Sequence, residues 1–142
     1  MGGCMHARQI APILNVADLV DSFEWFARLG CRKSWDWCEP GEDRPSFGAV
    51  ATGDLEIFLC RDGQGGRGQN GVWLSIFVDD VDAVHARCLR EQLEVMRGPE
   101  DEPWGVREMH VRHPDGHVLR IGSALDHSHD DDHDRDHPHP HT

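Results

Sequence analysis

Residues 10–30 read IAPILNVADLVDSFEWFARLG, an apolar run that leads into a helical pattern. Asp18 stands directly before that pattern, where a carboxylate accepts the free amide hydrogens of a first helical turn. Gly30 follows it, at the position where many helices end in the left-handed conformation. We therefore predict a helix over residues 19–29, in which Trp25 has a packing role. Its buried face is expected to carry Val20, Phe23, Phe26 and Ala27.

The same pattern, an apolar run followed by an Asp and a helical segment, recurs 62 residues later and begins with VWLSIFVDDV at residues 72–81. Asp80 takes the place of Asp18 and precedes a predicted helix over residues 81–92, with Val81, Val84 and Cys88 turned inward. Each helix is followed by three segments with strand character. These segments cover residues 31–38, 46–52 and 55–61 in the first half, and 94–98, 106–112 and 117–122 in the second. The Gly-rich link over residues 62–71 reads as a loop.

The predicted fold is therefore α+β, with the order βαβββ repeated in two modules, at residues 9–61 and 72–123. Neither module closes a core alone, so two curved sheets, each covered outside by its helix, are expected to enclose a cleft within one domain over residues 1–125. Residues 126–142, DHSHDDDHDRDHPHPHT, are almost only Asp, His and Pro. Such a segment has no apolar side chains to offset its ordering entropy, and we predict a disordered tail.

Composition excludes several classes of function. The formal net charge of −12 argues against nucleic acid as a partner, because phosphates require a basic surface. No apolar run is long enough for a membrane span, and the N-terminus lacks the apolar core of a secretory signal. The five cysteines show no CxxC spacing, which favours free thiols in a reducing cytoplasm.

Two segments carry a family resemblance. Residues 10–30, together with EPWGVREMHVRHPDGHVLRIG at residues 102–122, resemble the glyoxalase, bleomycin resistance and extradiol dioxygenase superfamily, also called vicinal oxygen chelate proteins. The second segment is most similar to bleomycin-binding resistance proteins, in which a Pro-Trp-Gly corner precedes a strand, a tight turn and a final strand. Here the corner is Pro103-Trp104-Gly105. The resemblance covers residues 9–123.

The resemblance also implies where a metal ion would bind. In enzymes of the superfamily, the ligands lie seven residues before each helix-capping Asp and four residues after the Gly of the final turn. Those positions hold Ala11, Trp73 and Arg120 here. None of these side chains donates an electron pair to a hard cation, and Glu56 adds at most one carboxylate. We therefore predict no metal ion in the cleft and no cofactor.

If the three positions that the resemblance implies face the cleft, alternation along the strands predicts further lining residues, because residues two apart share a face. A local polar network of Glu108, His110 and Arg112 is expected on one strand, and His113 and His117 are expected to be solvated turn residues. For Trp35 and Trp37, packing in the core is an equal alternative to ligand contact. The predicted ligand-binding residues are Ile13, Trp35, Trp37, Phe47, Trp73, Ser75, Phe77, Trp104, Val118 and Arg120.

An aromatic lining with few polar groups suits a planar or cationic small molecule. The predicted function is metal-independent sequestration of such a molecule, of the bleomycin-resistance type, by a cytoplasmic homodimer; catalysis is the less favoured interpretation. Acidic residues such as Glu100-Asp101-Glu102 would attract a basic ligand, or would simply be solvated. Two alternatives stay open: a metal-dependent lyase, isomerase or dioxygenase, and a structural or regulatory domain with a filled cleft.

Weak divalent metal binding is predicted for the tail through His127, His129, His133, His137, His139 and His141.

Overall fold

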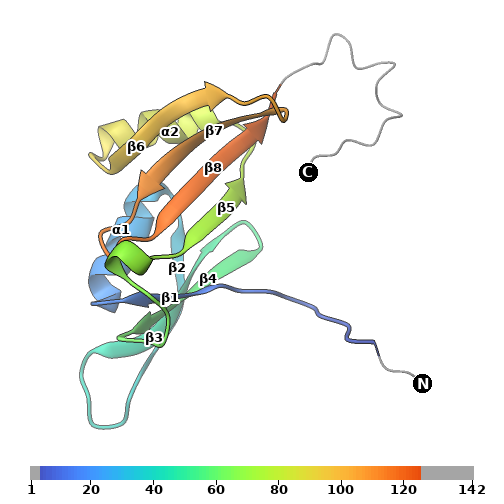
Figure 1. Ribbon diagram of the computed structural model, residues 1–142. Coiled ribbons are helices and arrows are strands. Elements are labelled where there is room, and N and C mark those ends of the chain that lie inside the picture. Colours follow the sequence, from blue (N-terminus) through green and yellow to red (C-terminus); the bar gives the residue numbers. More distant parts are fainter. Residues whose placement is uncertain (1–3, 126–142) are drawn as a thin grey trace. The chain divides into compact units, whose positions relative to one another are not determined.

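The computed structural model describes residues 4–125 and contains two compact units, which divide between Val72 and Trp73. In each unit a strand and a helix are followed by three strands (Figure 1). The first unit comprises β1 (Ile13–Val16), α1 (Leu19–Leu29), β2 (Arg32–Cys38), β3 (Pro45–Thr52), β4 (Leu55–Arg61) and the short 3-10 helix η1 (Gly68–Asn70). The second comprises β5 (Trp73–Phe77), α2 (Val81–Arg90), β6 (Glu94–Asp101), β7 (Val106–Arg112) and β8 (Val118–Ala124).

The two sheets have the same topology. Their strand orders are β1-β4-β3-β2 and β5-β8-β7-β6, and in each sheet the first pair is parallel while the others are antiparallel. In the second unit β6, β7, β8 and β5 run side by side (Figure 1). Within its own unit, α1 packs on β2, β3 and β4, and α2 packs on β6, β7 and β8. The predicted α+β class and the repeated βαβββ order are confirmed, whereas the predicted cleft between the modules stays a prediction.

Helix α1 begins and ends where the sequence predicts. The Asp18 carboxylate accepts the Asp21 amide hydrogen at 2.9 Å, and Gly30 has φ 115°, a left-handed conformation that glycine adopts without steric cost. The predicted buried face was partly wrong, because Val20 and Ala27 are exposed. The buried residues of the helix are Leu19, Ser22, Trp25 and Phe26. The apolar stripe therefore starts at the first helical residue, one position earlier than predicted.

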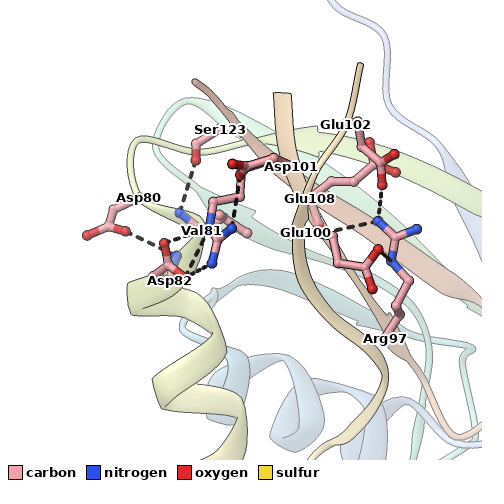
Figure 2. Close-up of polar contacts among 10 residues, drawn as sticks. Asp80, Val81, Asp82, Arg97, Glu100, Asp101, Glu102, Glu108 and Ser123 are labelled. Carbon is pink, nitrogen blue, oxygen red and sulfur yellow. Dashed lines mark hydrogen bonds and ion pairs between the residues drawn. The ribbon is translucent and has the colours of Figure 1, made fainter. Parts of the chain in front are cut away.

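Helix α2 is held at its N-terminus by two elements. The Asp80 carboxylate accepts the amide hydrogens of Asp82 and Ala83, and the Ser123 hydroxyl on β8 accepts that of Val81 at 3.3 Å. Arg107 on β7 also binds the Asp82 carboxylate at 3.0 Å. Figure 2 shows Asp80, Val81, Asp82 and Ser123 together at the first turn of the helix. Both N-cap predictions are thus confirmed.

Strand β6 is longer than predicted, since it continues through Pro99 to Asp101. Its pairing with β7 shifts register twice, between Val95 and Arg97 and again between Arg97 and Glu100. Such bulges, and a proline that donates no hydrogen bond, are tolerated because β6 is an edge strand of its sheet.

The turn between β7 and β8 contradicts the prediction of solvated histidines. His113 is 1 % exposed and His117 is 0 % exposed, and their rings lie 5.5 Å apart. The His113 amide donates to the His117 carbonyl, and His113 Nδ1 accepts the Asp115 amide hydrogen at 2.9 Å. Burial lowers the pKa of His113 to about 4, so that this ring is neutral at pH 7.

Among residues 4–125, no helix is long and apolar enough to span a membrane. The predicted tail, with its six candidate metal-binding histidines, lies outside the described residues.

Candidate functional site

A pocket of about 200 Å³ opens on the helix-free face of the second sheet, the face opposite α2. It combines aromatic, small and charged side chains in one concave surface. Its lining residues are Ser75, Phe77, Trp104, Val106, Glu108, Arg120 and Gly122. A pocket that holds a drug-sized molecule has a volume of roughly 300–1,000 Å³, so this pocket accommodates a smaller ligand or one part of a larger one.

Strand register brings these residues together. Ser75 on β5 lies opposite Arg120 on β8, and Phe77 lies opposite Gly122. On the other side of β8, Gly122 lies opposite Glu108 of β7. Because side chains two apart share a face, β5, β8 and β7 each contribute alternate residues to the same surface.

Gly122 keeps the floor of the pocket open. A Cβ atom at this position would meet the Arg107 carbonyl oxygen at 3.3 Å and the Glu108 Cβ at 3.4 Å. The contact with the oxygen is tighter than most Cβ contacts and the contact with the carbon is at the limit of ordinary packing, so a side chain here would be crowded at its base and would extend over the pocket floor.

Trp104 forms one wall and stands on a fixed turn. The Glu102 amide donates to the Val106 carbonyl, the Gly105 amide donates to the Glu102 carbonyl, and the Gly105 carbonyl accepts the Leu125 amide hydrogen. The indole is 58 % exposed, and its ring lies 5.9 Å from the Arg120 guanidinium carbon. The corner therefore presents an aromatic face beside a cation.

An ion pair forms the polar part of the pocket. Arg120 Nε donates to Glu108 Oε2 at 2.8 Å, and Arg120 Nη2 donates to Glu108 Oε1 at 3.0 Å. His110 Nε2 lies 3.3 Å from the same Oε2 atom, as the predicted polar network requires, whereas Arg112, its third predicted member, binds Glu94 of β6 instead. Glu108 is 5 % exposed, and the hydrogen bonds from Arg120 and then His110 hold the pKa of its carboxyl below the ordinary value despite burial. Glu108 is therefore ionised and bound at both oxygens.

The acidic stretch Glu100-Asp101-Glu102 on and after β6 is also paired with arginines. Arg97 binds the Glu102 carboxylate and lies 3.9 Å from Glu100, while Arg107 Nη1 donates to Asp101 at 2.9 Å. Figure 2 shows these carboxylates around their arginine partners. Two arginines therefore serve the three carboxylates of this stretch, and they compensate its negative charge only in part.

The first sheet also carries an aromatic cluster on its helix-free face. The ring of Trp35 lies 5.5 Å from Phe47 and 5.4 Å from Phe58, and Phe47 and Phe58 are 5.7 Å apart. Phe58 lies opposite Ile13 of β1, and Phe47 lies opposite Trp37 of β2. These aromatic residues come from β2, β3 and β4, with Ile13 of β1 beside them, and only Phe58 was absent from the predicted lining.

The predicted lining residues thus fall into two groups. Ser75, Phe77, Trp104 and Arg120 share the pocket of the second unit, whereas Ile13, Trp35, Trp37 and Phe47 belong to the aromatic face of the first. Trp73 and Val118 are paired beside the pocket, where the Trp73 ring meets His110 edge-on at 5.2 Å and Val118 is buried. Ligand binding by these residues stays a prediction.

Three residues that line the pocket were absent from the predicted lining, namely Val106, Glu108 and Gly122. Glu108 was recognised only as part of a polar strand face. Glu108 could have been found from the sequence by its spacing of two residues from His110, because both then share one face of β7, the strand that pairs with the strand of Arg120. Phe58 could have been found in the same way, by its alternation with Glu56 along β4.

The residues present do not fit the metal site that the superfamily implies. Trp73 and Arg120 hold two of the ligand positions, and Arg120 occupies both oxygens of the nearest carboxylate, Glu108. In the first unit, hydrogen bonds from Ser34 and Gln9 lower the pKa of Glu56 and occupy its carboxylate. Within the described part of the chain, no three His, Cys, Asp or Glu side chains gather as a metal site.

One family model matches most of the chain. The family model described as the Glyoxalase/Bleomycin resistance protein/Dioxygenase superfamily matches residues 6–121. No curated protein shows significant similarity to the chain.

Solved structures share the fold at low sequence identity. TioX from Micromonospora sp. ML1 is 22% identical, with a TM-score of 0.72 over 84% of this chain and 100% of TioX. TnmS3, an antibiotic binding protein from Streptomyces sp. CB03234, is 23% identical, with a TM-score of 0.68 over 88% of this chain and 100% of TnmS3. A glyoxalase-related enzyme from Clostridium phytofermentans is 19% identical, with a TM-score of 0.69 over 85% of this chain and 98% of the enzyme.

Proposed function

The chain belongs to the Glyoxalase/Bleomycin resistance protein/Dioxygenase superfamily, and from this premise we propose that it binds and sequesters a small aromatic or cationic molecule without a metal ion. The observation that carries the proposal is the pocket of the second unit. There an exposed indole and an exposed phenyl ring flank an ion pair, and Arg120 binds both oxygens of Glu108, the carboxylate among the described residues that line the pocket. The protein would then act by affinity and abundance, in the manner of a bleomycin-resistance protein.

The energetics of the pocket support binding. Phe77 is 65 % exposed and Trp104 is 58 % exposed, so both rings offer apolar area that a ligand would remove from water. An aromatic contact contributes about 0.5–1.5 kcal/mol beyond the burial of its area. Two such contacts together with the buried area give micromolar affinity at most for a fragment of the pocket's size. A larger antibiotic would bind more tightly by contacting further aromatic residues.

The similarity to TnmS3, an antibiotic binding protein, supports sequestration as the type of activity. Trp73 and Arg120 at two of the implied ligand positions argue against the metal-dependent lyase, isomerase or dioxygenase. We further propose that the protein is a cytoplasmic homodimer. The dimer is consistent with β2, an edge strand of its sheet that carries the exposed Trp37. Light scattering coupled to gel filtration measures the molar mass directly, and a monomer at all concentrations would exclude this part of the proposal.

The central test is a thermal-shift screen with planar aromatic compounds and metal-free bleomycin, followed by calorimetric titration of each compound that raises the melting temperature. Phe77→Ala and Trp104→Ala are expected to weaken binding severalfold. Leu89→Ala is the matched control, because Leu89 is an exposed apolar residue of α2 outside the pocket. Equal affinity in all three variants, or no binder in the screen, would refute binding in this pocket.

Metal content separates sequestration from metal-dependent catalysis. A variant that ends at Leu125 lacks the His-rich tail, so that tail-bound ions do not contribute to the measurement. Elemental analysis after purification without chelators is expected to find no stoichiometric divalent metal. One tightly held ion per chain would favour the enzyme interpretation.

A further inference from the structure

The chemistry of the ion pair specifies which ligands the pocket accepts. We propose that it selects a planar aromatic ligand that carries a hydrogen-bond acceptor, such as a carbonyl or carboxylate group, and disfavours a cationic amine. The acceptor would bind Arg120, and the ring would lie between Trp104 and Phe77. This inference rests on the proposed function and narrows its range of ligands.

Glu108 is poorly placed to receive a cation. Its side chain is 6 % exposed, and Arg120 binds both carboxylate oxygens while His110 contacts one of them. An ammonium group would have to displace a two-point interaction with a guanidinium, which is among the stronger pairings available to a carboxylate. Glu102, a second carboxylate close to the pocket, is also poorly placed to receive a cation, because Arg97 already binds it.

Arg120, in contrast, has donors to offer. Nε and one hydrogen of Nη2 point to Glu108, which leaves Nη1 and the second hydrogen of Nη2. Within residues 4–125, the hydrogen bonds that Arg120 donates come from Nε and Nη2 and end on Glu108, and 38 % of the Arg120 side chain is exposed. A guanidinium held on one edge by a carboxylate and flanked by an aromatic ring is pre-oriented to bind a planar acceptor with its other edge.

Glu108 then has a defined part in this site. It is a positioning residue, because it fixes the plane of Arg120 and lowers the local positive charge without contacting the ligand. Ser75 lies opposite Arg120 in the β5–β8 register, and its exposed hydroxyl offers a second donor near the acceptor. Both features favour an oxygen-bearing ring over an ammonium-bearing ring of the same size.

Three naphthalene derivatives of matched shape test the inference: 2-naphthamide, 2-naphthoate and 2-naphthylmethylammonium. Calorimetric titration of the full-length protein at pH 7 is expected to show the amide and the acid binding at least about tenfold more tightly than the ammonium compound. In the variant Glu108→Gln/Arg120→Gln, which leaves no buried charge unpaired, this preference should disappear. Arg120→Lys keeps the charge but loses the planar fork, and it should lose the affinity for the amide.

The outcomes separate this inference from the proposed function. If the ammonium compound binds as tightly as the other two, or if the double variant keeps the order of affinities, the acceptor hypothesis is refuted although the pocket still binds aromatic ligands. The same conclusion holds if none of the three binds while other aromatic compounds in the screen do. If no aromatic compound binds at all, the proposed function and this inference fail together.

Discussion

Removing Arg120 tests whether the pocket depends on a buried, compensated carboxylate. In Arg120→Met the Glu108 side chain, 6 % exposed, loses both of its charge-assisted hydrogen bonds and keeps only the contact with His110 at 3.3 Å. Breaking a fully buried ion pair costs about 3–5 kcal/mol. Because Arg120 is partly exposed and His110 remains, we expect a loss of about 2–3 kcal/mol in the free energy of unfolding.

A double-mutant cycle at pH 7 measures this interaction, with urea unfolding followed by tryptophan fluorescence. Glu108→Gln removes the charge and retains the shape, so Glu108→Gln/Arg120→Met should recover part of the stability lost in Arg120→Met. The expected coupling energy is about 1–2 kcal/mol in favour of the pair. A coupling energy near zero would show that the ion pair does not hold the pocket together.

The pH dependence gives a second, independent check of the same interaction. In the native protein the pKa of Glu108 is lowered mainly by Arg120, so the stability from this group is present above the ordinary value of 4.5 and is lost as the pH falls below it. In Arg120→Met the sign reverses, because protonation removes an unpaired buried charge. The variant should therefore approach the native protein in stability as the pH falls toward 4, and a constant difference between them would contradict the reasoning.

Three further predictions concern the rest of the fold. Asp80→Ala removes the acceptor for two amide hydrogens of α2 and should lower the free energy of unfolding by about 1 kcal/mol, measured by urea unfolding. Burial lowers the pKa of His113 from 6.5 to about 4, so the unfolded chain binds a proton over this interval that the folded chain does not. Stability should fall by roughly 2 kcal/mol between pH 7 and pH 5 from this group, and His113→Gln should remove that slope; an unchanged slope would contradict the assignment. Burial raises the pKa of the Cys88 thiol to about 11, so iodoacetamide at pH 8 should modify the exposed Cys38 and leave Cys88 intact until the protein is denatured, as mass spectrometry would show.

Much of the secondary structure could be predicted because its signals are local. Asp18, Gly30 and Asp80 act on amide groups only a few residues away, and all three end or begin helices as expected. The buried face of α1 was harder to predict, because Val20 and Leu19 are both apolar and only packing against β2, β3 and β4 selects between them. The error at His113 and His117 has a similar origin, since a polar turn gives no local sign of being covered.

The candidate site, too, could be predicted only in part from local signals. The resemblance implied that Trp73 and Arg120 face the cleft, and period-two alternation then placed Ser75 and Phe77 on the same face as Trp73. It could not show that β5 pairs with β8, more than forty residues further along the chain, or that Glu108 would bind the guanidinium of Arg120 with both oxygens. A strand's alternation depends only on its own backbone, whereas the register between strands follows from how the whole sheet packs against its helix. The sequence by itself therefore determined which side chains share a face, and the tertiary structure decided which of them meet and what charge they leave for a ligand.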